Sequence, residues 1–244
     1  MSGDRSSDLL GLRPYGETLR VLAQGGVDGA GAFLGRICLP AAEEFGLYLK
    51  DRVSAWRKGH AVGIVQKAEV LIGPGAEGFQ AHPRLVMRII DEGSWSDDDA
   101  VQGMWAGLLA TSCDAGGRDE SNLIFVNLLG QMTTCQARVF RFACEHANVR
   151  LTPGGLLFAE EQVWPREEIV RVSGVSDLHR LDREIDHLRD IGVLYASAGF
   201  SPGPDKVTRT TPSTLGLQLY VRCQGFRGSP EAFFKLDSVP QSGS

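Results

Sequence analysis

The sequence predicts a mainly α-helical fold, with an N-terminal helical array followed by a winged-helix-like α+β module that carries a small β-hairpin. Three observations predict this class. The central stretch, residues 96–110, places apolar residues at helical spacing on one stripe. Further segments repeat this period between Gly- and Pro-containing breaks. In the second half, helical patterns precede two strand patterns that flank a Gly/Pro-rich turn.

Composition suggests four parts within the 244 residues. We expect a disordered N-terminus over 1–14, which is rich in Ser and Asp, and a helical domain over 15–132. A winged-helix-like module follows over 133–224, and a flexible tail over 225–244, where Ser, Pro and Gly recur.

The overall charge argues against a non-specific nucleic-acid binder. The formal net charge is -5, the pI is about 5.6 and hydrophobic residues make up 43% of the chain. Such a binder needs a basic surface. The chain begins without a secretory signal pattern and has no apolar run long enough to span a membrane, so we expect a cytoplasmic protein. Scattered spacing without a CxxC pair predicts reduced, mostly buried thiols at Cys38, Cys113, Cys135, Cys144 and Cys223.

The first helices are expected before residue 93. A helix over 15–37 is weakened by five glycines, and residues 29–35 lack the spacing and the preceding strand of a dinucleotide-binding loop. Pro40 suits the start of a helix, and we expect a second helical run to continue it past Gly59 to Gly73. Its expected apolar stripe is Phe45, Leu49, Val53 and Trp56, continued by Ile64, Ala68 and Leu71. Pro83 opens a shorter helix carrying Leu85, Val86, Ile89 and Ile90, with Gly93 as the residue that follows its end.

The central helix has the strongest pattern. We expect Ser96 as its N-cap, with Asp99 in the position of a capping-box acid. Its apolar stripe is Val101, Met104, Trp105, Leu108 and Leu109. A second face is small, with Gly103, Gly107 and Ala110, so another helix could approach closely there.

Two more helices complete the expected first half and begin the second. Residues 123–129 are apolar nearly all round, which predicts a buried helix. Thr133 and Gln136 form a capping box for the next helix, whose core face holds Cys135, Val139 and Phe142.

The remaining segments predict the α+β module. A turn over 152–155 leads to a short strand or packed loop over 156–158, and a short helix is expected over 165–172. Ser176 is the expected cap of a helix that Gly192 stops. A strand over 193–197, a hairpin tip over 199–205, a return strand over 207–210 and a final helix from Thr211–Pro212 to Cys223 follow.

The residue patterns nominate no catalytic, cofactor-binding or metal-binding residue. The histidines show no zinc-ligand spacing and the sequence has no nucleophile elbow and no Walker lysine. They are His60, His82, His146, His179 and His187. Helix capping explains the acids Asp97, Asp98 and Asp99. The tryptophans Trp56, Trp95 and Trp105 are interpreted as core residues.

A DNA-reading role has one candidate helix, over 177–191. Its solvent side carries more acids than arginines, whereas a helix that enters the major groove is expected to be basic or neutral. We therefore disfavour nucleic acid as a partner and expect the module to serve in packing or dimer contacts.

Three stretches resemble the abortive infection alpha family, a bacterial group linked with phage defence. The first is residues 40–46 leading to Asp51-Arg52-Val53 and Trp56-Arg57. The second is residues 92–94 with Asp97-Asp98, and the third is residues 104–110. The resemblance spans about residues 38–223 and includes a Thr-Pro-x-x-Leu-Gly segment at 211–216, but the chain departs from the usual family pattern over 116–122.

The resemblance implies a mostly helical protein with no established catalytic residues to transfer. It implies a non-enzymatic cytoplasmic interaction protein that acts in abortive infection on a protein partner of unknown identity, and it leaves a homo-oligomer open. Two alternatives stay open as well. One is a winged-helix transcriptional regulator, and the other is a membrane-perturbing effector that uses residues 15–37 as an interfacial helix.

Overall fold

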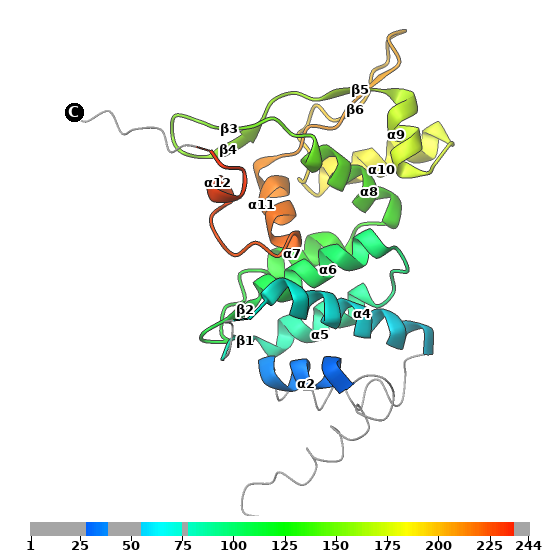
Figure 1. Cartoon of the computed structure of the whole chain (residues 1–244). Coiled ribbons are helices and arrows are strands. Elements are labelled where there is room, and N and C mark those ends of the chain that lie inside the picture. The colour runs from blue at the N-terminus through cyan, green and yellow to red at the C-terminus, as the bar shows by residue number, and fades with distance from the viewer. Residues whose placement is uncertain (1–27, 39–54, 75–77, 237–244) are drawn as a thin grey trace, which may run out of the picture.

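The computed structural model describes the protein over residues 28–38, 55–74 and 78–236 (Figure 1). Helices dominate and the strands form small antiparallel sheets, which confirms the predicted mainly α fold with a small β component. The helices are α2 (Asp28–Ile37), α4 (Ala55–Ile72), α5 (Pro83–Gly93), α6 (Asp99–Thr111), α7 (Leu123–Gly130), α8 (Thr134–Glu145), α9 (Arg166–Ser173), α10 (Leu178–Asp190), α11 (Thr214–Cys223) and α12 (Pro230–Phe233). The strands are β1 (Gln80–Ala81), β2 (Cys113–Asp114), β3 (Val149–Leu151), β4 (Leu157–Ala159), β5 (Val163–Pro165), β6 (Gly199–Phe200) and β7 (Val207–Arg209).

Helix α6 lies in the middle of the molecule and packs against α4, α5, α7, α8 and α11 (Figure 1). Its predicted apolar stripe is confirmed, because all five of its side chains are buried: Val101, Met104, Trp105, Leu108 and Leu109. Ala106 and Ala110 on other faces are buried too. A helix that is apolar on several faces can be covered by several neighbours, which is why α6 organises the fold.

The N-cap of α6 is Asp98, so the prediction of Ser96 is wrong. The Asp98 carboxylate accepts the Val101 backbone N–H at 3.0 Å, whereas the Ser96 hydroxyl accepts the N–H of Asp98 in the turn before the helix. Asp98 also binds Arg138 of α8. This tertiary partner adds to the capping interaction and selects one cap among several candidates.

The small face of α6 is covered on one turn and open on the previous one. A Cβ atom placed on Gly107 would lie 1.9 Å from the carbonyl oxygen of Cys223, which confirms the predicted close approach of another helix, here α11. A Cβ atom placed on Gly103 would have nothing within 4 Å. The open turn forms part of the site described below.

Helix α4 runs unbroken past Gly59 and ends just before Gly73, which confirms the predicted continuation. Ile64 and Ala68 are buried, but Leu71 is 44% exposed and is not the core residue that the spacing predicts. The expected residues Phe45, Leu49 and Val53 of the preceding helical stretch lie outside the described residues. Helix α2 contains residues 29–35, so this segment is helical.

Helix α5 begins at Pro83 and buries its four predicted apolar residues. Gly93 is its last residue rather than the one that follows it. The reason for glycine here is steric, since a Cβ atom would lie 2.8 Å from both Ile64 Cδ1 and Trp105 Cγ. Helix α7 is only partly buried, because Ile124 is 50% exposed.

The start of α8 forms as predicted. The Thr133 hydroxyl accepts the Gln136 N–H at 3.2 Å, and the Gln136 side chain accepts the Thr133 N–H at 2.8 Å. Strands β3 and β4 then form a hairpin across the predicted turn at 152–155. Helix α9 follows near its predicted position.

Strands β5, β7 and β6 form a three-stranded antiparallel sheet in that order, in which Trp164 and Phe200 both lie opposite Thr208. Strand β7 confirms the return strand, but residues 193–197 do not form the predicted strand. Only a single bridge joins Leu194 to Pro212, and the strand that pairs in the hairpin is β6, within the predicted tip. The designation as a winged helix stays a prediction.

The last two long helices begin one or more residues later than expected. Asp177 rather than Ser176 caps α10, because its carboxylate accepts two backbone N–H groups. Ser213 caps α11, which begins after the predicted Thr211–Pro212 start. Gly192 has φ 80°, a left-handed conformation that ends α10 as predicted.

One buried apolar cluster extends from Phe33 in α2 to Cys223 in α11 and so crosses the expected boundary at 132/133. Phe233 and Phe234, which lie within the segment predicted as a flexible tail, pack against this cluster at α12. The four-part division of the chain stays a prediction.

Candidate functional site

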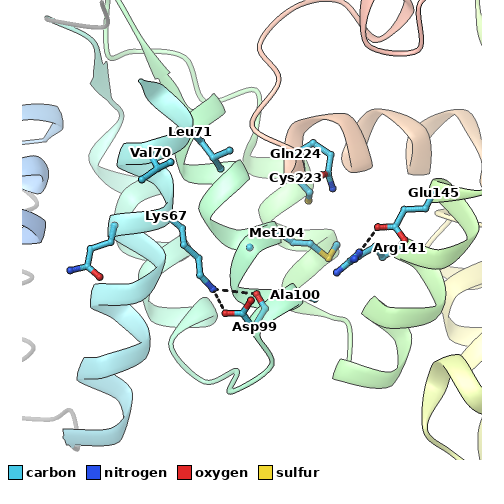
Figure 2. Close-up of a pocket in the computed structure, with 12 residues that line it drawn as sticks. Lys67, Val70, Leu71, Asp99, Ala100, Met104, Arg141, Glu145, Cys223 and Gln224 are labelled. Carbon is cyan, nitrogen blue, oxygen red and sulfur yellow. Dashed lines mark hydrogen bonds and ion pairs between the residues drawn. The ribbon is translucent and has the colours of Figure 1, made fainter. Parts of the chain in front are cut away.

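A hollow of about 600 Å³ lies over the open turn of α6. Helix α4 forms one wall, and α8 with the end of α11 forms the other (Figure 2). We call this hollow the α6 groove. It is lined by Gln66, Lys67, Val70, Leu71, Asp99, Ala100, Gly103, Met104, Arg141, Glu145, Cys223 and Gln224.

The floor of the α6 groove is small and apolar. Ala100, Gly103 and Met104 follow one another at helical spacing on α6. Because Gly103 has no side chain and nothing lies within 4 Å of its Cβ position, a guest could approach the backbone of α6 closely. The sequence pattern identifies this small face but does not reveal that one turn stays uncovered.

The rim of the groove on α4 is apolar and exposed. Val70 is 80% exposed and Leu71 is 44% exposed, and both line the hollow (Figure 2). Single exposed apolar residues are ordinary, whereas adjacent ones beside a hollow mark a surface for interaction.

Two ion pairs stand at opposite sides of the groove (Figure 2). Lys67 Nζ donates to Asp99 Oδ1 at 2.6 Å, and Arg141 Nε donates to Glu145 Oε1 at 2.6 Å. Lys67 also approaches the Gln102 side-chain oxygen at 3.5 Å. The two terminal Nη groups of Arg141, by contrast, donate to no atom among the residues that the structure describes.

A second hollow of about 330 Å³ adjoins the first between α6, α8 and α9. The two hollows share Ala100, Met104, Arg141 and Glu145. The second one adds Phe142, His146, Arg138, Glu168 and Arg171. The two hollows are therefore neighbours, and Arg141 lines both of them.

Two carboxylates that bind arginines of this second hollow are held in the ionised form: Asp98, the partner of Arg138, and Glu168, the partner of Arg171. Burial alone would raise the pKa of Asp98, but the Val101 N–H and Arg138 outweigh it and hold that pKa below its ordinary value. A hydrogen bond from Arg171 likewise lowers the pKa of Glu168. Both acids are therefore fixed anions at neutral pH.

All five cysteines are buried, as predicted, and Cys113, Cys135, Cys144 and Cys223 are free thiols. Burial raises the pKa of Cys113 to about 12 and that of Cys135 to about 11. Burial also raises the pKa values of Cys144 and Cys223 far above the ordinary range. Since the thiolate is the reactive form, these four side chains are poor nucleophiles at neutral pH.

Three of the histidines make local contacts in separate places. His82 accepts the Arg84 N–H at the start of α5, and His146 Nδ1 lies 2.9 Å from the Phe142 carbonyl oxygen. His60 lies near the Ser94 carbonyl oxygen. Within the described ranges, no group of three or more His, Cys, Asp or Glu side chains is arranged to hold a metal ion.

The acids at 97–99 do more than cap a helix. Asp98 caps α6 and binds Arg138, while Asp99 binds Lys67 across the groove. Capping therefore explains Asp98 only in part and does not explain the position of Asp99.

Two of the three predicted core tryptophans are exposed. Trp105 is buried, but Trp56 and Trp95 lie at the surface. The guanidinium of Arg57 lies 3.8 Å from the ring centroid of Trp95, which is a cation–π contact that covers one face of the ring. Sequence spacing does not reveal this contact, because Arg57 lies in α4 and Trp95 in the turn that follows α5.

Helix α10 and its N-cap Asp177 expose more acids than arginines. Arg180 and Arg183 are exposed beside Asp182 and Asp190, and Glu184 turns inward to Thr133 and Gln136 of the α8 capping box. The DNA-binding alternative stays a prediction.

In the segment considered for the membrane alternative, Phe33, Leu34 and Ile37 of α2 are buried in the core. No described helix is both long and apolar enough to cross a lipid bilayer. The membrane-perturbing alternative also stays a prediction.

Comparison with known proteins gives one match. No curated protein and no solved structure matches the chain. The sequence profile described as abortive infection alpha matches residues 64–210, more than half of the 244 residues. This span contains two of the three stretches that carry the resemblance, including the core of α6, and its N-terminal limit lies inside α4. The chain therefore belongs to the abortive infection alpha family.

Proposed function

We propose that this protein acts in bacterial phage defence, by abortive infection, through contacts with a partner protein rather than through catalysis. Membership of the abortive infection alpha family supports the defence role. The α6 groove is the surface at which the protein holds its partner.

The observation that best supports a docking role is that the α6 groove has an exposed apolar rim above an apolar floor. Val70 and Leu71 stand exposed on α4 above Gly103 and Met104 on α6. Covering this apolar surface would stabilise a complex by about 25 cal/mol for each Å² removed from water, less the cost of ordering the partner.

The charges around the groove support binding in preference to acid–base chemistry. A general acid or base works best with a pKa near the operating pH. Among the lining residues, buried Cys223 in the groove has a raised pKa, and Glu168 in the adjoining hollow has a lowered pKa. These groups therefore keep one protonation state near neutral pH.

The test is phage plating on cells that express the full chain, with Val70→Glu as the groove variant and Ile124→Glu as its matched control. Both positions are exposed helical surface, but Ile124 on α7 does not line the groove. Exposed substitutions change stability by only about 0.5 kcal/mol, so both variants should stay folded, which thermal unfolding checks.

We expect the wild type and Ile124→Glu to reduce plating equally and Val70→Glu to lose the protection. Full protection by Val70→Glu contradicts the docking role. Absence of protection by the wild type across a diverse phage panel in the native host contradicts the defence role.

A further inference from the structure

We infer that the partner segment in the α6 groove is an amphipathic helix whose docked face carries a Glu or Asp side chain that binds the guanidinium of Arg141. This inference rests on the proposed function, because it specifies the chemistry of the protein that the groove holds.

The walls of the groove favour a helical guest over an extended one. An extended peptide usually binds by adding a strand to an exposed sheet edge, where unpaired N–H and C=O groups are available. Helices α4, α6, α8 and α11 supply the walls and none of the lining residues belongs to a strand, so the groove has no sheet edge to which an extended guest could pair. A guest here must satisfy its own backbone, which a helix does.

The floor suits the close approach of a helix. Gly103 and Ala100 lie one turn apart and present almost no side chain, while Met104 beside them is flexible and adapts its shape. A guest helix can therefore bring apolar side chains down onto α6 between the Val70 rim and the α8 wall. The adjoining hollow, which Phe142 lines, shares Ala100 and Met104 with the groove floor.

The cationic side chains of the two hollows differ in how many of their N–H groups already donate to an acceptor. Arg138 donates Nε and Nη2 to Asp98, and Lys67 donates to both Asp99 and Gln102. Arg141 donates only Nε, to Glu145. Its two Nη groups point to no described acceptor, although the side chain is only 40% exposed and lines both hollows.

A docked helix would remove water from Arg141, which creates a requirement for an acceptor. A guanidinium fork matches a carboxylate with two parallel hydrogen bonds, and a guest that lacks such a group would leave the Nη donors unsatisfied. Glu145 already neutralises part of the charge, so one guest carboxylate suffices. A guest that places Lys or Arg there would be rejected.

The experiment selects guests from a displayed library of helical peptides of about 16 residues, long enough to form helices, randomised along one face on an Ala-rich scaffold. The bait is the full chain, as wild type, Arg141→Gln, Gly103→Leu or Arg150→Gln. Arg150 is the matched control, since it pairs with Glu160 on the β3–β4 hairpin away from the groove. Circular dichroism and thermal unfolding confirm that each bait is folded.

On the wild type and on Arg150→Gln, we expect enrichment of apolar residues at helical spacing with Glu or Asp at one fixed position. Gly103→Leu fills the floor and should abolish the enrichment. On Arg141→Gln the acidic preference should disappear. For a selected peptide, changing its Glu to Gln should weaken binding to the wild type about five- to tenfold and leave binding to Arg141→Gln unchanged, as measured by fluorescence anisotropy.

Three results would overturn the inference: no enrichment above that of Gly103→Leu, an acidic preference that survives in Arg141→Gln, or enrichment of basic residues. A full-length dimer that Gly103→Leu dissociates would also overturn it, since a second copy would then occupy the groove. If the selection succeeds while Val70→Glu still protects cells from phage, the proposed function fails and the binding chemistry stands. If Val70→Glu loses protection but the selection fails, the proposed function stands and the inferred binding chemistry fails.

Discussion

Replacing Gly107 by Ala adds a single methyl group at the closest approach of two helices. That methyl carbon would lie 1.9 Å from the Cys223 carbonyl oxygen and 2.3 Å from its carbonyl carbon. These are backbone atoms of α11, so no side chain can rotate away. Helices α6 and α11 must move apart by roughly 1.5 Å to restore ordinary contact distances.

The expected loss of stability follows from two opposing effects. Alanine is better than glycine within a helix by about 0.5–1 kcal/mol. Overpacking a tight contact costs about 1–3 kcal/mol, and a clash with backbone belongs at the upper end of that range. The net effect is a decrease of about 2 kcal/mol in the free energy of unfolding, which lowers the Tm by roughly 4–8 °C for a chain of this size.

The same substitution at Gly103 is the control, because both glycines lie in α6. Nothing lies within 4 Å of the Gly103 Cβ position, so Gly103→Ala keeps the helix advantage and should raise the Tm by roughly 2–4 °C. Thermal unfolding followed by circular dichroism measures both. Equal Tm shifts in the two variants, or a Gly107→Ala protein as stable as the wild type, would refute the conclusion that α11 covers Gly107 and leaves Gly103 open.

Three further predictions concern caps and thiols. Because the pKa of Asp98 is lowered in the folded state, its ionised carboxylate stabilises the fold at pH values above its ordinary pKa of 3.8. This contribution is lost as the pH falls through the folded-state pKa. Urea titrations should therefore show that the stability advantage of the wild type over Asp98→Asn shrinks in acid, and a difference that does not change with pH would contradict this. Thr133→Ala removes the N-cap of α8 and should cost about 1 kcal/mol in urea unfolding, so an unchanged midpoint would argue against the capping box. Iodoacetamide at pH 8 should alkylate the native protein slowly and the unfolded chain quickly, and rapid native labelling would contradict the buried state of four thiols, Cys113, Cys135, Cys144 and Cys223.

The sequence predicts those elements whose signals are local. The capping box at Thr133 and the helix opened by Pro83 depend on residues within one turn, and both form as expected. The N-caps at Ser96 and Ser176 are displaced to the next suitable acids, because an aspartate carboxylate in each case reaches the backbone N–H groups of the first turn. Local patterns thus locate a helix better than they locate its first residue.

The strand expected over 193–197 fails for a tertiary reason. Val193 and Leu194 have strand-forming side chains, but both are buried beside α11, and the Val193 carbonyl accepts the Ser213 N–H at the start of that helix. Pairing is therefore limited to one bridge. Strand propensity reports the fit of a side chain to a buried surface and does not fix the partner of the backbone.

The groove itself could not be predicted from spacing, because its walls come from segments far apart in the chain. Gly103 and Gly107 look alike in the sequence, and only the position of α11 distinguishes the covered glycine from the open one. The available signal in the sequence was the adjacent apolar pair Val70 and Leu71, and both side chains are exposed in the structure. Similarly, only the fold places the guanidinium of Arg57 over the ring of Trp95.

Site-specific photo-crosslinking in the native host tests the docking role of the α6 groove most directly. A benzoylphenylalanine residue replaces Val70 in the rim or Ile124 outside it, and cells are irradiated before and during phage infection. We predict one discrete adduct to a second protein from position 70, absent from position 124 and abolished when Gly103→Leu fills the floor. No adduct at position 70, or the same adducts from both positions, would contradict the assignment of this groove as the partner-binding surface.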